Sequence, residues 1–197
     1  DQFKITVEGR GGHAAKPHDT VDSALVSAQI VVALQSVVAR NADPVDQLVL
    51  SVTGIRTATD THNVIPQRTF LQGTVRSLRP EVRDLAEARL GAVARGVAEG
   101  FGAEVTLEYE RGYPVMVNHG RETGFAADVA RAVSGACAEA PYVLGGEDFA
   151  YMLEARPGAY ILVGNGEGAM VHHPEYDFND EAIPAGCSWW VGMVEER

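Results

Sequence analysis

The sequence predicts an α+β protein whose first part, residues 1–112, has a ferredoxin-like fold and is followed by an incomplete α/β segment, residues 113–197. Strand-like and helix-like stretches follow one another in the order β-α-β-β-α-β up to about Gly112. After Gly112 few stretches have strand character. The order specifies a four-stranded antiparallel sheet with two helices on one face.

The first strand and helix are separated by a glycine-rich loop. Residues 3–7 alternate apolar and polar side chains, as a half-buried strand does. The loop runs from Gly9 to His18, and we expect Thr20 to cap the helix that follows. Apolar residues recur there at helical spacing and predict the face that meets the sheet: Val21, Leu25, Ala28 and Val32.

The rest of the first part supplies three strands and a helix. Residues 47–55 and 69–77 are rich in β-forming side chains, and residues 103–109 alternate as a fourth strand. The second helix is expected to begin at Pro80 and to end at Gly100 and Gly102. Its predicted apolar face contains four residues: Leu85, Ala88, Val93 and Val97.

The second part is predicted to be mostly helical. We expect helices over residues 121–138, 147–153 and 182–194, and a compact buried strand over residues 159–163. Such a set of elements does not read as a self-contained domain. Because the chain opens at Asp1 directly into a strand-like stretch, we also expect a processed or truncated chain.

Composition excludes several classes of protein. The net charge of -11 argues against nucleic acid and against anionic membranes as partners. Sequence inspection finds no apolar run that approaches the ~20 residues of a membrane span. The two cysteines, Cys137 and Cys187, have neither a metal-ligand spacing nor a secreted disulfide pattern. We therefore expect a protein of the reducing cytoplasm.

Three residues of the first part have side chains suited to an anionic substrate. His13 lies among glycines and alanines, where an imidazole has room to donate a hydrogen bond to an oxyanion. The amide of Asn63 and the planar guanidinium of Arg76 can each hold a carboxylate. On local grounds alone, a turn histidine, a turn-capping asparagine and a solvated arginine are the plainer interpretations.

The second part contains two further candidates. His172 and His173 precede Pro174, and one imidazole there could bind zinc, although a zinc centre needs three or four ligands. Glu147 follows two glycines and could act on a substrate, but its position before a predicted helix favours a cap.

Together these segments are far more specific than any one of them. The series resembles the aminoacylase-like zinc peptidases, and most closely their hippurate hydrolase and auxin-conjugate amidohydrolase branch. The motifs that carry the resemblance occur in this order: GGHAAKPH at 11–18, NVIP at 63–66, GTVR at 73–76, GGEDF at 145–149 and HHPEYDFND at 172–180.

The resemblance implies a lid, residues 1–112, which also forms a homodimer, and the C-terminal part of a catalytic domain, residues 113–197. His13 then matches a histidine that stabilises the oxyanion in the partner's site. Asn63 and Arg76 match residues that hold the substrate and its carboxylate, and His172 matches a metal ligand with His173 as its neighbour. The resemblance assigns no role to Glu147.

By the same resemblance, the whole enzyme hydrolyses the amide bond of N-acyl amino acids with a divalent metal pair, such as zinc or manganese. The remaining metal ligands and the glutamate that acts as general base are not in this sequence. We therefore expect this chain alone to bind no metal tightly and to be inactive. The alternative is a non-catalytic dimerisation and substrate-binding module.

Overall fold

The computed structural model describes residues 1–196, so Arg197 of the predicted second part lies outside the described residues. The chain divides into two compact units, Asp1–Val115 and Met116–Arg197. Each unit has its own core, and each is described by itself.

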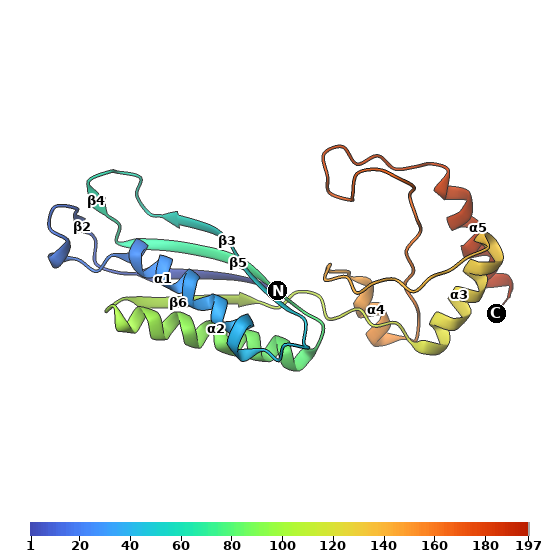
Figure 1. Ribbon diagram of the computed structural model, residues 1–197, viewed down its shortest axis with the longest axis horizontal. Helices are drawn as coiled ribbons and strands as arrows, with labels where there is room; N and C mark the ends of the chain where they lie inside the picture. Colours follow the sequence, from blue (N-terminus) through green and yellow to red (C-terminus); the bar gives the residue numbers. More distant parts are fainter. Residues whose placement is uncertain (197) are drawn as a thin grey trace. The chain divides into compact units, whose positions relative to one another are not determined.

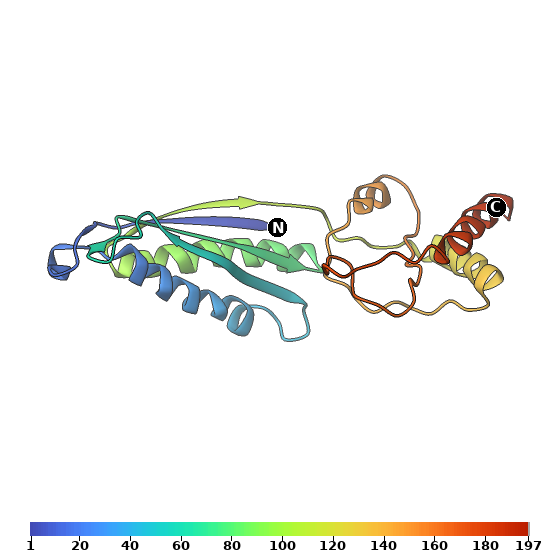
Figure 2. The same ribbon diagram turned by 90° about the horizontal axis from the view of Figure 1, so that it is seen from above.

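The first unit is a four-stranded antiparallel sheet covered on one face by two helices (Figures 1 and 2), as the sequence predicts. The sheet order is β3-β5-β1-β6, so the first and third of its strands lie at the centre. The strands are β1 (Gln2–Glu8), β3 (Leu48–Thr57), β5 (Arg68–Ser77) and β6 (Glu104–Glu110). The helices are α1 (Ser23–Ser36), which continues as the π-helical turn η2 (Val37–Asn41), and α2 (Pro80–Gly100).

Helix α1 turns a different face to the sheet from the one predicted. Its buried positions include Val26, Ile30 and Leu34, whereas Leu25 is 50% and Val32 69% exposed. Both faces of the helix are apolar, so the spacing of apolar residues could not choose between them. Its N-cap is also not Thr20, because the carboxylate of Asp22 accepts hydrogen bonds from the backbone N–H groups of Ala24 and Leu25 at 2.9 and 3.2 Å.

Helix α2 begins at Pro80 as expected, but its buried face also differs from the predicted one. Val93 and Val97 pack at the edge of the core and Ala88 is exposed. Alanines supply much of the inner face, where their small side chains let the helix lie close to the sheet. The buried residues of α2 are Val82, Ala86, Leu90, Gly91, Ala94 and Ala98.

One helical stretch, Ser23–Asn41, is long and apolar enough to cross a membrane by length and composition alone, with a mean hydropathy of 1.5. This corrects the expectation that no such stretch exists. Core helices of soluble proteins pass the same test, and here Val26, Ile30, Leu34 and Val37 are buried in the core of the first unit. The stretch is therefore weak evidence for a span.

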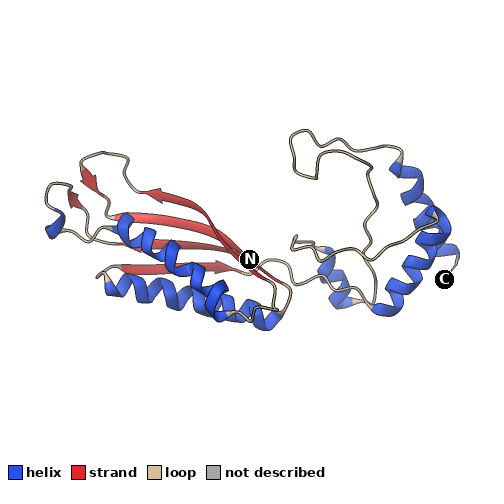
Figure 3. Cartoon of the chain, in the orientation of Figure 1, coloured by secondary structure: helices blue, strands red, loops and turns tan. Residues whose placement is uncertain are grey.

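The second unit contains three helices and, among residues 116–196, no strand (Figure 3). They are α3 (Gly120–Ser134), α4 (Phe149–Ala155) and α5 (Ala182–Glu195). Helix α3 ends earlier than expected, because Gly135 adopts a left-handed conformation with φ 79° that caps it. A small core joins α3 to α5, where the buried indole N–H of Trp189 donates to the carbonyl of Ala126 at 3.1 Å.

The buried strand predicted over residues 159–163 is wrong. Leu162 is 65% exposed, and the backbone of Tyr160 bonds a side chain rather than a neighbouring strand. The amide of Asn118 donates to the Tyr160 carbonyl at 2.9 Å and accepts from its N–H at 2.8 Å. A strand requires a hydrogen-bonded partner strand, and none lies among residues 116–196.

Candidate functional site

The first unit ends in a small tip that brings His13 and Asn63 together. The tip consists of the two-stranded sheet β2 (Gly12–His13) and β4 (Val64–Ile65) with its flanking loops, and it lies at the end of the large sheet opposite the N-terminus (Figure 1). His13 pairs with Val64, and the N–H of Ala14 donates to the carbonyl of Asn63 at 3.0 Å. Two of the three predicted site residues of this unit, the catalytic His13 and the substrate-binding Asn63, are thus neighbours along the backbone.

The imidazole of His13 is exposed and held in one orientation by its own loop. Its Nδ1 accepts a hydrogen bond from the N–H of Ala15 at 3.0 Å. In a neutral imidazole, a nitrogen that accepts leaves the proton on the other nitrogen. The Nε2–H of His13 is therefore the group that can donate to an oxyanion.

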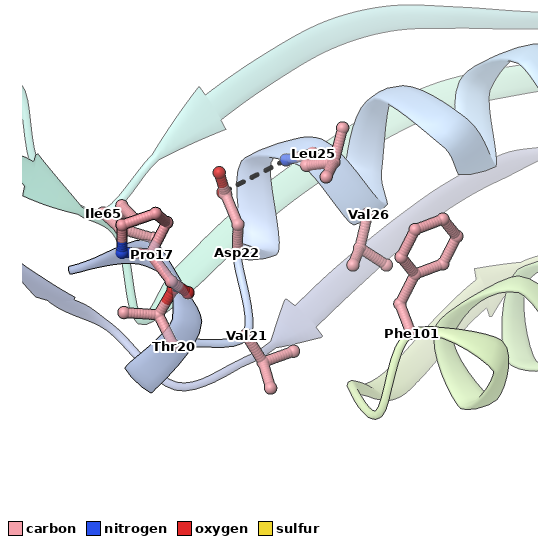
Figure 4. Close-up of a pocket in the computed structure, with 8 residues that line it drawn as sticks. All are labelled: Pro17, Thr20, Val21, Asp22, Leu25, Val26, Ile65 and Phe101. Carbon is pink, nitrogen blue, oxygen red and sulfur yellow. Dashed lines mark hydrogen bonds between the residues drawn. The ribbon is translucent and has the colours of Figure 1, made fainter. Parts of the chain in front are cut away.

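Beside the tip lies a pocket of about 260 Å³ at the N-terminal end of α1 (Figure 4). Ile65 of β4 and Pro17 of the short 3-10 helix η1 (Pro17–Asp19) form one side, and Phe101, which caps α2, forms another. Its one charged lining residue, Asp22, is engaged in capping α1. The pocket is lined mainly by apolar side chains, and among its lining residues Asp22 is the only acid or base.

Arg76 lies at the other end of the sheet from the tip. It pairs with Val49 near the end of β5, whereas Arg68 at the start of the same strand adjoins the tip. The eight residue steps between Arg68 and Arg76 correspond to about 26 Å along an antiparallel strand. The structure does not bring Arg76 together with His13 and Asn63 within one chain.

A partly buried ion pair lies at the Arg76 end of the first unit, near both Asp1 and Gly112. The carboxylate of Asp1 is bound by the guanidinium of Arg83, by the Tyr109 hydroxyl at 2.8 Å and by the Gly112 N–H at 3.0 Å. Burial raises the pKa of Tyr109 to about 12, so at neutral pH the phenol keeps its proton and donates. Sequence patterns do not reveal this network, because its hydrogen-bonded residues lie 29 to 111 positions apart.

In the second unit, His172 is distinguished by its backbone. With φ 70°, it is the one non-glycine residue among residues 1–196 with a positive φ. Such strain is frequent at functional sites. His173, in contrast, is engaged in the same turn, where its Nδ1 accepts from the N–H of Glu175 at 3.1 Å. The difference favours His172 over its neighbour as the ligand.

The residues that the structure describes do not supply a complete ligand set for a metal ion. Within residues 1–196, no group of three or more His, Cys, Asp or Glu side chains could hold a metal ion. His172 therefore has no companions that would form a zinc or manganese site. The residues present do not fit a metal pair by themselves, and no chemical step through a metal follows from their geometry.

Glu147 joins the start of α4 to Tyr160. Its carboxylate accepts from the N–H of Phe149 at 3.3 Å and from the Tyr160 hydroxyl at 3.1 Å. These hydrogen bonds, the backbone one foremost, hold the pKa of Glu147 below its usual value. Desolvation, followed by the bond to Glu147, raises the pKa of Tyr160. The carboxylate is thus stabilised in its charged form at the start of α4, whose N-cap residue is Asp148, without a side-chain cap hydrogen bond of its own.

Comparison with known proteins decides the family. The model of peptidase family M20/M25/M40 matches residues 5–196, nearly the whole chain. The chain belongs to this family. The resemblance to aminoacylase-like peptidases is thereby confirmed.

Relatives in the M20 family are about twice as long as this chain. An N-acetylcysteine deacetylase of Bacillus subtilis is 32% identical over 98% of the chain and 51% of its own length. An N-acetyldiaminopimelate deacetylase of Priestia megaterium is 35% identical over 98% and 52%. The crystal structure of YXEP from Bacillus subtilis, described as a dinuclear metal-binding M20 peptidase, superposes with a TM-score of 0.79 at 26% identity, over 98% and 48%. The chain spans about half the length of the relatives it matches.

Two residues whose side chains hold loops of the M20 chain in place were not identified from the sequence. Asn118 is one, since its amide replaces a strand partner for Tyr160. Gln67 is another, because its side chain bonds the backbone of the histidine loop. The only sequence signal for Gln67 was its place next to the NVIP motif.

Proposed function

We propose that this chain forms the lid and the C-terminal part of the catalytic domain of a metal-dependent amidohydrolase that cleaves N-acyl amino acids, hippurate-type substrates among them. The observation that carries the proposal is the tip, where β2 and β4 place His13 beside Asn63. A plain dimerisation module has no need of an exposed imidazole that is held in one orientation. Both relatives named above are deacetylases of N-acetyl amino acids, which supports the substrate class.

In this proposal His13 acts as an oxyanion donor. Its Nδ1 is occupied by the Ala15 N–H, so Nε2–H is presented to the carbonyl oxygen as negative charge develops there. Such a donor acts mainly in the transition state, and its loss lowers kcat more than it raises KM. Asn63 supplies a second polar group on the same tip, suited to a carbonyl or carboxylate of the substrate.

Arg76 is proposed to hold the substrate carboxylate, but not in the same site as His13 of its own chain. The two lie at opposite ends of β5, and an N-acyl amino acid spans only ~10 Å, about three backbone steps. A site that uses both must take one from each of two chains. As the family resemblance implies, we assign His13 to the partner's site, and we therefore assign Arg76 to the site of its own chain.

The homodimer that this requires has a candidate surface in the first unit. Helix α1 carries outward apolar side chains, Leu25 and Val32, that the core does not use. Strand β3 is an edge of the sheet, and its Val49 and Ile55 are also exposed. An open edge beside an exposed apolar stripe favours association with a second copy. We propose that two lids pair through α1 and β3.

A divalent metal pair belongs to the proposal for the longer protein. His172 would supply one ligand, with the others from chain outside residues 1–196. When bound, such metals lower the pKa of a bridging water and so provide the nucleophile. For the compartment we propose the cytoplasm, since Cys137 and Cys187 are both unpaired and exposed in the described chain.

Hydrolysis measured in the longer protein tests the proposal. Purified enzyme with zinc or manganese should release amino acid from N-acetylcysteine and from hippurate, and a chelator should abolish the release. His13→Ala should lower kcat by ~10² or more. His62→Ala, at an exposed histidine in the loop before Asn63, is the matched control and should leave kcat unchanged. A metal-loaded protein that cleaves neither substrate would favour the alternative, a non-catalytic dimerisation module.

A further inference from the structure

Two arms carry the tip: residues 8–13 form the first arm and residues 63–68 form the second. The backbone pairing between them contains a break in register. The ladder between β1 and β5 ends where Glu8 faces Arg68, and the ladder between β2 and β4 begins where Gly12 faces Ile65. Between these pairs the first arm has three residues and the second arm has two. One extra residue on one strand is a β-bulge, and it shifts the register beyond it by one.

Arg10 is the extra residue. Its backbone turns away from the opposite arm and pairs with Val21, with both N···O distances 2.9 Å. The opposite arm offers Pro66 at this point, which has no N–H to donate. Pro66 therefore cannot serve as a backbone donor here, and two groups that flank Arg10, the carbonyl of Gly9 and the N–H of Gly11, bond a side chain instead.

The side chain of Gln67 takes both of these groups. Its amide nitrogen donates to the carbonyl of Gly9 at 2.6 Å and to the carboxylate of Glu8 at 3.1 Å. Its amide oxygen accepts from the N–H of Gly11 at 2.9 Å. The Gln67 backbone also accepts from the N–H of Gly9 at 2.8 Å. One residue thus clamps the arm on both sides of Arg10.

The arms are closely packed at this clamp. A Cβ on Gly11 would lie 2.8 Å from the backbone nitrogen of Gln67 and 2.9 Å from the carbonyl oxygen of Ile65, so only glycine allows the approach. Below the clamp, the buried hydroxyl of Ser23 donates to the carbonyl of Pro66 at 2.8 Å and lies 2.9 Å from the hydroxyl of Thr69. The second arm is therefore anchored to α1 and to β5.

The bulge decides which way His13 faces. If the register of β1 and β5 continued, His13 would lie opposite Asn63, but in the structure it lies opposite Val64. A shift of one residue turns each side chain to the opposite face of a strand. We propose that Gln67 is a positioning residue, which holds the bulge and thereby sets the direction of the His13 imidazole. The predicted effect of Gln67 on kcat rests on the proposed function. Its predicted effect on the structure of the bulge does not.

Kinetics of the longer enzyme test the catalytic consequence. Gln67→Met keeps the length of the side chain and removes its hydrogen bonds. It should lower kcat by roughly 10- to 100-fold and leave KM within about twofold, because a small misplacement of a catalytic group acts on the transition state. The double variant with His13→Ala should be no slower than His13→Ala alone. Gln72→Met, at an exposed glutamine within β5, is the matched control and should retain wild-type kcat.

Hydrogen exchange in the same proteins tests the structural consequence. In Gln67→Met the amides of Gly11 and Ala14 should exchange faster, while those of Ile5 and Leu71 in the central strands stay protected. Protection lost throughout the sheet would mean that the variant unfolds. In that case Gln67→Asn, which keeps the amide but shortens its reach by one methylene, repeats the comparison.

A failure of the positioning role of Gln67 can be distinguished from a failure of the proposed function. If His13→Ala lowers kcat but Gln67→Met neither lowers it nor loosens Gly11, the positioning role is wrong while the proposed function stands. Additive losses in the double variant would also overturn the positioning role. If His13→Ala has no effect on kcat, the proposed role of His13 is wrong, and faster exchange at Gly11 and Ala14 would still support the clamp.

Discussion

The separation of Arg76 from the tip leads to a prediction about mixed dimers. His13→Ala and Arg76→Ala enzymes should each be nearly inactive, yet should regain activity when their subunits exchange. In a mixed dimer, one site takes an intact Arg76 from its own chain and an intact His13 from the partner. The other site has lost both groups. Recovery follows only if the two side chains reach a site from different chains.

The expected gain in activity depends on the distance between Arg76 and the tip and on the fraction of mixed dimers. About 26 Å of β5 separates Arg76 from the start of the tip, more than twice the ~10 Å length of the substrate. Random exchange makes about half of the dimers mixed, and each mixed dimer has one intact site, so about a quarter of all sites are intact. Either parent should retain ~1% of wild-type kcat/KM or less. Mixing should therefore raise activity about 25-fold.

The assay is hydrolysis of N-acetylcysteine before and after subunit exchange, at subsaturating substrate. Tagging one parent allows mixed dimers to be isolated, which shows that exchange has occurred. An equal mixture of His62→Ala and Arg76→Ala enzymes is the control, and it should keep about half of wild-type activity before exchange. If isolated mixed dimers of the two defective parents stay at the parental level, His13 and Arg76 serve the same site from one chain.

Three further predictions concern the chain itself. Arg83→Met leaves the buried carboxylate of Asp1 without its cation, and should cost about 3 kcal/mol and lower the unfolding midpoint of the first unit by about 10–20 °C in a calorimetric scan; an unchanged midpoint would contradict it. Because the pKa of Glu147 is lowered, its bond to Tyr160 contributes stability above the ordinary carboxyl pKa that is lost as pH falls through the lowered value. Glu147→Gln should abolish that acid transition in the Tyr160 NMR signal. The 197-residue chain should retain no zinc after dialysis, and a stoichiometric ion held through His172 would refute this.

The order of elements in the first unit could be predicted from sequence because each element carries its own local signal. Residues 3–7 alternate with period two and lie within β1, and Pro80 begins α2 as its fixed φ favours. The inner face of α1 could not be predicted. Leu25 and Val32 lie seven residues apart and Val26 and Ile30 four, and both separations fit one face of a helix, so only packing against the sheet decides which stripe is buried.

In the second unit, residues 159–163 have the composition of a strand but not the pairing. β-propensity describes how well a side chain fits a pleated, half-buried surface, and it does not supply the neighbouring strand. Here Asn118 satisfies the backbone of Tyr160, while Leu162 and Val163 remain exposed. A pattern read along the chain cannot reveal whether a partner strand is at hand.

For the candidate site, too, the sequence predicts the individual residues but not their arrangement. Residue type and motif singled out His13, Asn63 and Arg76, because imidazole, amide and guanidinium groups suit an anionic substrate. The proximity of His13 to Asn63 depends on pairing between segments about 50 residues apart, and the register of that pairing depends on the extra residue at Arg10. The spacing along the chain could not show that Gln67 holds this bulge.

The most direct test of the account is the affinity of a tetrahedral phosphinate analogue of an N-acyl amino acid, measured by calorimetry in the longer, metal-loaded enzyme. An oxyanion donor contributes to a tetrahedral, charged ligand and little to a planar amide. His13→Ala should therefore weaken binding of the analogue by about 100-fold and leave binding of the amino acid product within about twofold. Equal affinity of wild type and His13→Ala for the analogue would contradict the role assigned to the tip.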